Sequence, residues 1–272
     1  MPVYTCFFPP LLTYRGFAVI ICCMSGNLRH APVLSERLSN VKDMLGYADS
    51  VWDVGCDHGY LASALLASGA AKHIYATDLS PVSVAKAERS FEAKGQMDSV
   101  SLAVADGLSG FAPKGDYKLA LCGMGGELIA QILSSGSAVA EGASLIVMQP
   151  MRGEEELRRF LLEAGYTFVD ERVVCDDGRF YQIIAARYGG RDEVPAWFPK
   201  GYYRFGWLMC DRYDEALFTL LTRFRGVYAS QLEIAEASGT RPQKLVSELA
   251  AVDKLIGHLT ELGGFSRQVN AD

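Results

Sequence analysis

The stretch VWDVGCDHGYL at residues 51–61 decides the fold class, because an apolar run ends there in glycines and acids. Aspartate and glycine are disfavoured inside strands, so the strand-like run stops near Gly55. Gly55 lets a backbone approach a ligand closely, and Gly59 permits a tight turn into the helical stretch that follows. The pattern predicts a strand, a turn and a helix, with a ligand close to the turn.

The same alternation of short apolar runs and helical stretches continues along the chain. We expect strands at residues 50–57, 73–80, 100–107, 117–125 and 143–150, with helices at 59–70, 81–95 and 126–136 and a loop around 108–115. The helices end near Gly69, Gly95 and Gly136, which suit the position after a helix. Repeated strand–helix–strand units predict a parallel sheet with right-handed crossovers.

Two further strands close the sheet. A helix at 152–165 precedes strand-like runs at 166–177 and 180–188, which only Gly178, Arg179 and their neighbours connect. That connection is too short for a crossover helix, so these strands must pair antiparallel. The predicted fold is therefore α/β, with the seven-stranded Rossmann-like sheet and terminal antiparallel hairpin of class I methyltransferases.

The chain is divided into three regions by composition. Residues 1–23 are apolar with Arg15 as the only charge, and we expect a disordered extension; a membrane or export role is the alternative. Residues 24–190 form the predicted methyltransferase domain, and residues 191–272 form a C-terminal helical domain. Two apolar stripes within 213–262, interrupted at Gly239 and Pro242, predict a helical hairpin that forms an antiparallel coiled coil. The alternative is that both stripes pack on the main domain.

Composition narrows the functional classes. The 272 residues carry a net charge of −6, which argues against nucleic-acid binding by overall charge alone. Seven dispersed cysteines without a C-x-x-C pair argue against a disulfide framework and against a zinc site. We expect a cytoplasmic monomer with no metal and no membrane partner.

Acidic side chains follow the first three predicted strands. Asp53 and Asp57 flank a turn that lacks the G-x-G-x-x-G spacing, and they suit the amino group or sulfonium of S-adenosylmethionine better than a pyrophosphate. Asp78 ends the second strand, where an acid commonly binds ribose hydroxyls, in nicotinamide enzymes as well. Asp106 follows the third strand and suits an adenine amino group. The alternatives are a strand-end cap for Asp53 and a simple Asp-Gly turn for Asp106.

A glycine-rich segment, LCGMGGELI at residues 121–129, follows the fourth predicted strand. Gly123, Gly125 and Gly126 leave backbone groups open at the position where amino-methylating enzymes hold their target base. The Asn/Asp-Pro-Pro-aromatic sequence usual there is absent. A phosphate-binding glycine loop is the alternative, against which stands the lack of Gly-Lys-Ser/Thr.

Together these motifs resemble one family. LSERL, DVGCDHGYL, ATDLSP, ADGL, GMGGELIAQIL, MQP and YYRFG are similar to motifs of the bacterial tRNA (adenine(22)-N1)-methyltransferases, from about residue 33 to residue 260. The resemblance implies methyl transfer from S-adenosyl-L-methionine to N1 of a tRNA adenine, with the C-terminal coiled coil helping to hold the tRNA. The alternatives are a methyltransferase acting on another RNA, a protein or a small molecule, and a non-enzymatic RNA-binding scaffold.

The resemblance also assigns residues. It implies cofactor binding by Asp53, Gly55, Asp57, His58, Asp78, Leu79, Asp106, Gly107 and Gly123, and a catalytic set of Asp57, Gly123, Met124, Gln149 and Pro150. Ser35 and Arg37 match a motif near the site entrance. Met151 stands where the family has Asn, Cys56 replaces Ser or Thr, and Gly59 replaces Ala.

Adenine N1 carries an in-plane lone pair, so the expected mechanism is positioning and desolvation more than acid–base catalysis. Asp57 or His58 is the candidate acceptor for the proton released afterwards, with a purely structural role as the alternative for His58. The candidate tRNA phosphate contacts are Arg29, Arg37, Arg204, Arg223 and Arg225, and Ser35 is a further candidate residue for the tRNA substrate. This small basic set predicts tRNA binding that weakens only gradually with salt.

Overall fold

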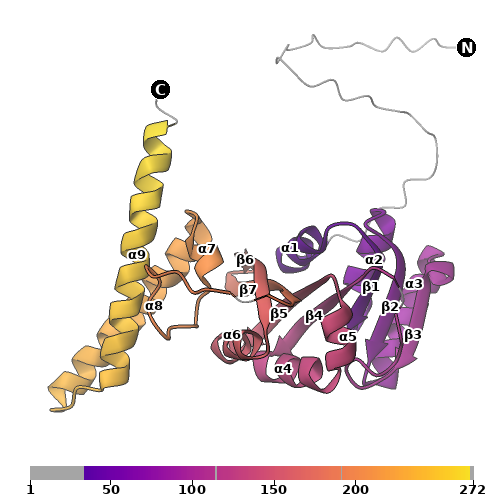
Figure 1. Ribbon diagram of the computed structural model, residues 1–272, viewed down its shortest axis with the longest axis horizontal. Helices are drawn as coiled ribbons and strands as arrows, with labels where there is room; N and C mark the ends of the chain where they lie inside the picture. Colours follow the sequence, from indigo (N-terminus) through magenta and orange to yellow (C-terminus); the bar gives the residue numbers. More distant parts are fainter. Residues whose placement is uncertain (1–33, 114, 191, 270–272) are drawn as a thin grey trace, which may run out of the picture. The chain divides into compact units, whose positions relative to one another are not determined.

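A computed structural model describes residues 34–113, 115–190 and 192–269 (Figure 1). The predicted extension at residues 1–23 and the candidate contact Arg29 lie outside the described residues. The described residues belong to one compact unit. The predicted domain boundary at residue 190 stays a prediction.

The sheet has seven strands in the order β3-β2-β1-β4-β5-β7-β6. Its members are β1 (Ala48–Val54), β2 (Ala71–Asp78), β3 (Val100–Val104), β4 (Tyr117–Gly125), β5 (Leu145–Arg152), β6 (Tyr166–Asp176) and β7 (Arg179–Tyr188). The first five are parallel, and β7 pairs antiparallel with both β5 and β6. The predicted sheet and its terminal hairpin are confirmed. The chain order reverses between β1 and β4, which is where open sheets of this kind bind ligands.

Helices cover both faces of the sheet. One face packs on α1 (Glu36–Leu45), α2 (Tyr60–Ala67) and α3 (Pro81–Lys94), and the short 3₁₀ turn η1 (Met97–Ser99) precedes β3. The other face packs on α4 (Gly126–Ser135), α5 (Ser137–Gly142) and α6 (Glu154–Glu163). Alternate residues of β1 enter the two cores, with Val51 on one side and Trp52 on the other.

The helix α1 was not among the predicted elements. Ser35 is its N-cap, and its hydroxyl accepts the N–H of Leu38 at 3.4 Å. Val41 and Leu45 of α1 are fully buried against the sheet. The cap and the buried face explain why the LSERL motif forms a helix, and they bring its first turn to the sheet edge where the strands end.

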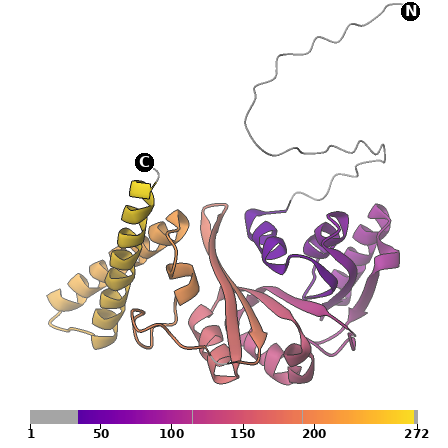
Figure 2. The same cartoon turned by 45° about the horizontal axis from the view of Figure 1, so that its top comes forward.

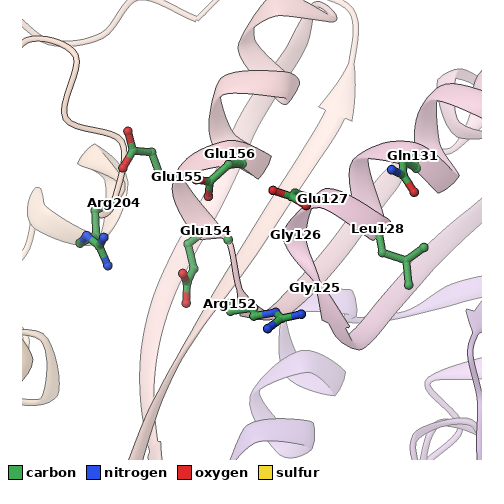
Figure 3. A pocket seen from close by; sticks show the side chains of 11 residues that line it. Gly125, Gly126, Glu127, Leu128, Gln131, Arg152, Glu154, Glu155, Glu156 and Arg204 are labelled. Carbon is green, nitrogen blue, oxygen red and sulfur yellow. The ribbon is translucent and has the colours of Figure 1, made fainter.

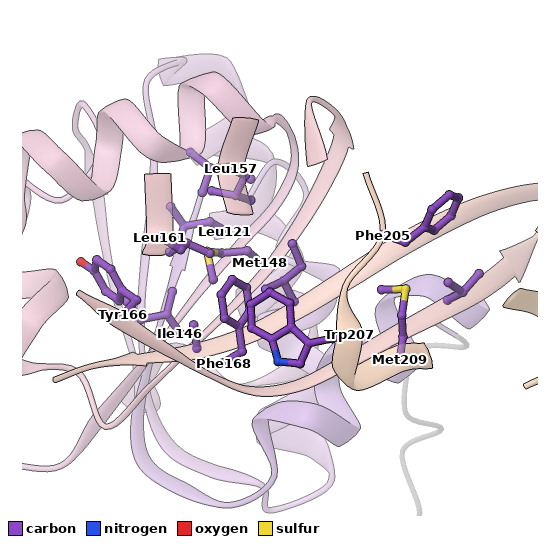
Figure 4. Close-up of a cluster of buried hydrophobic side chains, with 14 of the residues drawn as sticks. Leu121, Ile146, Met148, Leu157, Leu161, Tyr166, Phe168, Phe205, Trp207 and Met209 are labelled. Carbon is purple, nitrogen blue, oxygen red and sulfur yellow. The ribbon is translucent and has the colours of Figure 1, made fainter. Parts of the chain in front are cut away.

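The C-terminal part contains α7 (Trp207–Cys210) and a hairpin of α8 (Glu215–Ala237) and α9 (Gln243–Val269), which lie side by side in Figures 1 and 2. Leu221 of α8 and Leu255 of α9 are buried in the same cluster as Phe205 and Trp207. Figure 4 shows Phe205 and Trp207 within that cluster. The predicted helical hairpin is confirmed, whereas its coiled-coil geometry stays a prediction.

A buried ion pair joins Arg158 of α6 to Glu171 of β6, and the same arginine holds the segment before α7. Arg158 and Glu171 are both fully buried, and Nε of Arg158 lies 2.7 Å from Oε1 of Glu171. Arg158 also donates to the carbonyl oxygens of Tyr203 and Arg204 at 3.2 and 3.1 Å, and to the side chain of Gln182 at 2.7 Å. These bonds satisfy a guanidinium that would otherwise be very costly to bury.

Candidate functional site

The turn after β1 is held by backbone hydrogen bonds that require its glycines. The N–H groups of Gly55 and Cys56 both donate to the carbonyl of Thr77 in β2, at 2.8 and 2.9 Å. Gly55 has a φ of 73°, and a Cβ there would lie 2.5 Å from Cε of Met124. Gly59 has a φ of 68°, and a Cβ there would lie 2.7 Å from the ring of Phe91. Both glycines therefore serve close packing as well as backbone freedom.

Asp57 and Asp78 meet at this turn. One carboxylate oxygen of Asp78 accepts the backbone N–H of Asp57 at 3.1 Å, and the other accepts the N–H of Ser80 at 2.8 Å. Asp57 itself has a φ of 45°, a left-handed conformation that is rare outside glycine. His58 lies 3.7 Å from the Asp57 carboxylate and stacks on Tyr60 at 5.3 Å between ring centroids. The predicted acids after β1 and β2 are thus brought together by direct contacts.

Asp53 is the buried acid of the site. It is only 4% exposed, and burial raises its pKa to about 7. A hydrogen bond from the backbone of Ala62 opposes this shift, while the negative charge of Asp78 adds to it. The environment therefore penalises an isolated negative charge, and a bound cation would relieve the penalty.

A cavity of about 380 Å³ opens beside these groups. It is lined by residues from α1, the turn after β1, α2 and the end of β4, namely Arg37, Leu38, Asp53, Gly55, Cys56, Asp57, His58, Tyr60, Leu61, Cys122 and Gly123. Gly123 has a φ of 76°, and a Cβ there would meet no atom within 4 Å. The end of β4 therefore presents open backbone to the cavity, as the predicted glycine segment requires.

A fully buried amide stands behind this open backbone. Oε1 of Gln149 in β5 accepts the N–H of Gly123 at 3.2 Å and a hydrogen bond from the Arg37 guanidinium. Its Nε2 donates to the carbonyl of Pro150 at 2.7 Å and lies 3.8 Å from the sulfur of Met151. Met151 is 46% exposed, so the residue that departs from the family pattern lies beside Gln149 at the surface.

Other predicted cofactor residues lie outside the described lining of the cavity. Leu79 is 69% exposed, Asp106 is exposed beyond the end of β3, and Gly107 is at the same loop. Asp78 reaches the cavity only through its bond to Asp57. Their assignment to cofactor binding stays a prediction.

The candidate tRNA arginines are spread over several elements. Arg204 lies over the ring of Phe224 at 5.3 Å, and Arg223 of α8 lies over Phe180 of β7 at 4.7 Å. Arg225 forms an ion pair with Asp253 of α9 at 2.6 Å. Each of these guanidinium groups already has a partner within the chain, although Arg223 and Arg225 remain exposed.

A second cavity, of about 530 Å³, lies at the start of α4 and α6 (Figure 3). Its lining includes two arginines, Arg152 and Arg204, and four glutamates, Glu127, Glu154, Glu155 and Glu156. Acids at helix N-termini stabilise the helices, and this excess of negative charge disfavours phosphate. The alternative of a phosphate-binding glycine loop is therefore not supported at this end of α4.

The described residues contain no cluster of three or more His, Cys, Asp or Glu side chains suited to a metal ion. Among the same residues, no helix has the length and apolar character that crossing a membrane requires.

Comparison with known proteins agrees with this geometry. The family model of the methyltransferase domain matches residues 34–184, more than half of the chain. The chain belongs to the methyltransferase domain family. A curated relative carries a more specific likeness. The tRNA (adenine(22)-N(1))-methyltransferase of Bacillus subtilis is 29% identical over 161 residues, which cover 59% of this chain and 68% of that protein.

Solved structures of tRNA (m1A22) methyltransferases share the fold over most of the chain. Sp1610 of Streptococcus pneumoniae, in complex with S-adenosyl-L-methionine, is 25% identical, has a TM-score of 0.72 and aligns over 82% of this chain and 99% of its own. The Bacillus subtilis m1A22 tRNA methyltransferase TrmK has the same fold, with a TM-score of 0.65 at 24% identity over 84% of this chain and 98% of its own. The resemblance to the tRNA (adenine(22)-N1)-methyltransferases is confirmed.

Sequence reasoning missed the bond between Arg37 and Gln149. The two residues are 112 positions apart, and Arg37 was expected to contact tRNA near the site entrance. Its neighbours in LSERL carry no signal that the guanidinium would turn inward. Only the position of α1 against the sheet reveals the pairing.

Proposed function

We propose that this protein is an S-adenosyl-L-methionine-dependent tRNA methyltransferase that modifies N1 of an adenine. The observation that carries the proposal is one cavity in which the acidic turn after β1 faces the open backbone of Gly123. The similarity to tRNA (adenine(22)-N1)-methyltransferases supports adenine 22 as the target.

The residues of the cavity fit the cofactor. Asp53 and Asp57 supply the negative charge that its amino group and sulfonium require, and the glycines of the turn leave room for close approach. We assign the ribose hydroxyls to Asp78, whose oxygens retain unused lone pairs, and the adenine amino group to Asp106. When bound, the cofactor supplies the methyl group that is transferred.

The chain's own residues then position and desolvate the reacting base. Gly123 offers backbone polar groups and free space to a purine, while Met124 packs behind the turn at Gly55. The N1 lone pair needs no prior deprotonation, so precise placement supplies most of the rate enhancement. Asp57 or His58, which are in contact, can take the proton that the methylated adenine releases from its exocyclic amine.

The basic side chains of the C-terminal half are the proposed tRNA contacts. Arg223 and Arg225 are exposed on α8, and Arg204 is at the edge of the second cavity. Because so few cations are available, affinity for tRNA should fall with salt along a shallow slope. We propose a cytoplasmic location, which suits a tRNA substrate, and a monomer, which is supported by a cavity lined by residues of one chain.

The decisive experiment supplies labelled S-adenosyl-L-methionine and unmodified tRNA, followed by nucleoside analysis. The expected product is 1-methyladenosine, and a tRNA with guanosine at position 22 is the matched control substrate. Label on the protein or on small molecules, with none on tRNA, would overturn the proposal.

The exposed Met151 favours one specific alternative, methylation of a different adenine. Mapping the modified position by primer extension separates the two. A stop at another position, retained with the guanosine-22 control, identifies the alternative target.

A further inference from the structure

Arg37, Gln149 and Gly123 form one hydrogen-bonded chain from three separate elements. Arg37 lies in the first turn of α1, Gln149 in β5 and Gly123 near the end of β4. The guanidinium of Arg37 and the N–H of Gly123 both donate to the same oxygen, Oε1 of Gln149. The chain runs from a helix on one face of the sheet to the open backbone of the cavity.

These bonds fix the orientation of the Gln149 amide. The side chain is completely buried, and its Nε2 donates to the carbonyl of Pro150 at 2.7 Å. A flipped amide would place an N–H group against two donors, Arg37 and Gly123, and would leave the Pro150 carbonyl facing an acceptor. Loss of the guanidinium removes the stronger, charged donor and leaves a buried acceptor half-satisfied.

Arg37 is itself held in place inside the protein. The cap by Ser35 fixes the first turn of α1, and the guanidinium lies 5.6 Å from the ring centre of Tyr181 in β7. Burial raises the pKa of the Cys122 thiol, the charge of Asp53 raises it further, and the charge of Arg37 opposes both. The guanidinium therefore acts at the end of β4, where Arg37 and Cys122 both line the cavity.

We infer that Arg37 is a positioning residue for methyl transfer, which holds Gln149 and, through it, the backbone of Gly123 in the conformation that receives the base. The inference rests on the proposed function. Gly123 has a left-handed φ of 76° and no neighbour that a Cβ would touch, so packing alone does not hold it. Its neighbours Cys122 and Met124 pair with β5 across a register shift, and the N–H bond to Gln149 restrains Gly123 itself within that irregular stretch.

The test uses three variants: Arg37→Ala, Gln149→Ala and the double variant that carries both changes. Lys42→Ala is the matched control, because it removes a cation from the same helix away from the cavity. Arg37→Ala should lower kcat about 10- to 100-fold, because small displacements of a reacting base are costly. The KM for tRNA and its salt dependence should stay unchanged. The double variant should be no slower than the slower single variant, because both changes break one chain.

Two readouts separate positioning from a general loss of structure. Millimolar guanidinium ion should restore part of the kcat of Arg37→Ala but not of Gln149→Ala. Arg37→Lys, which keeps the cation without the planar fork, should have an intermediate kcat and replaces the alanine variant if that fails to fold. A higher KM for tRNA with a flatter salt dependence and an unchanged kcat would instead make Arg37 a phosphate contact and overturn the inference.

Hydrogen–deuterium exchange tests the same restraint without activity. The amides of Gly123 and Met124 should exchange faster in Arg37→Ala than in the wild-type protein or in Lys42→Ala. Unchanged exchange would sink the positioning role even if the wild-type protein methylates tRNA. If the amides exchange faster in Arg37→Ala but the wild-type protein leaves tRNA unmodified, the proposed function is refuted and the restraint by Arg37 is not.

Discussion

The carboxylate of Asp78 accepts the backbone N–H of Asp57 at 3.1 Å, so one side chain from the end of β2 holds the turn that follows β1. Its second oxygen accepts the N–H of Ser80, next to the start of α3. The acid expected to bind ribose therefore also shapes the turn that lines the cavity. The structural role of Asp78 and its predicted binding role can be separated by substitution.

Asp78→Ala removes both acceptors and should lower the free energy of unfolding by about 2 kcal/mol. It should weaken cofactor binding by more than that same free energy. Asp78→Asn keeps one carbonyl acceptor and should recover part of the stability. Thermal unfolding and calorimetric titration with S-adenosyl-L-methionine measure the two effects. Asp98→Ala, at an exposed site in η1, is the control, and a loss of stability equal to that of the control would contradict the structural role.

Asp53 predicts an unusual dependence of stability on pH. Burial raises its pKa in the folded protein to about 7, from 3.8 in a model carboxyl group. The unfolded chain thus releases this proton near pH 4 and the folded chain only near pH 7, so stability falls as pH rises between these values and is constant above them. Asp53→Asn should be more stable than wild type at pH 8, by at most about 4 kcal/mol, and should show no advantage at pH 4. Urea unfolding at pH values from 4 to 8 measures the difference.

The same group links cofactor binding to protons. A cation bound beside Asp53 favours the ionised carboxyl, so affinity for S-adenosyl-L-methionine should rise as pH approaches and passes 7, with a proton released on binding below that value. Titrations in buffers of different ionisation enthalpy detect the proton. Asp53→Asn should bind weakly at every pH and release none. Equal proton release by both proteins would assign the titration to another group.

The sequence predicts the sheet well because its signals are local. Short apolar runs, the glycines after the helices and the tight connection at Gly178 are each read within a few residues, and the parallel pairing of the first five strands follows from crossover rules. The meeting of the acids at the ends of β1 and β2 is also predictable, because neighbouring parallel strands end at the same edge of the sheet.

The polar contacts between distant parts of the chain could not be predicted from the sequence. Arg37 and Arg158 look like ordinary charged residues of amphipathic helices, yet both point inward to partners far away in sequence. Leu79 resembles a buried strand-end residue but is exposed, because β2 ends at Asp78 and the chain turns toward α3. These outcomes depend on where elements pack, which no local pattern encodes.

The glycines at the end of β4 should differ sharply in what they tolerate. Gly123→Ala introduces a Cβ at a left-handed position into open space, so it should cost about 1 kcal/mol of stability but obstruct the base and abolish most activity. Gly69→Ala adds the same kind of strain, with no atom within 4 Å, away from the cavity, and should leave activity intact. Unfolding free energies and methyl-transfer rates for the pair test this, and equal activities would show that no substrate occupies the space beside Gly123.

Gly126→Ala is the contrasting case. A Cβ there would lie 2.0 Å from the carbonyl oxygen of Gly153, because the starts of α4 and α6 meet backbone to backbone. Relief requires one helix to move, so we expect a loss of several kcal/mol and little folded protein. Circular dichroism of the purified variant checks this, and a native melting curve would show that the two helices can separate at low cost.

The buried pair of Arg158 and Glu171 should control how firmly the C-terminal part is attached. Arg158→Met leaves an unpaired buried carboxylate, frees the carbonyl of Tyr203 and leaves that of Arg204 with its bond from Gln182, so it should cost about 3–5 kcal/mol. The adjacent Arg159→Ala removes an exposed ion pair with Glu155 and the contact of the Arg159 guanidinium with the Tyr203 ring, 5.4 Å from the ring centre, and should cost less than about 1 kcal/mol.

Limited proteolysis locates the effect of that pair. Because Arg158 holds the segment before α7, cleavage near residues 199–206 should be faster in Arg158→Met than in Arg159→Ala, while the sheet core stays resistant. A double variant, Arg158→Met with Glu171→Leu, removes the unpaired charge and should regain part of the unfolding free energy. It should not regain protection of the 199–206 segment, because the carbonyl of Tyr203 and the N–H of Leu208 still lack their partners. The carbonyl of Arg204 keeps its bond from Gln182 but not the one from Arg158. If protection returned with stability, the charge itself and not the hydrogen bonds to the backbone would be what anchors this segment.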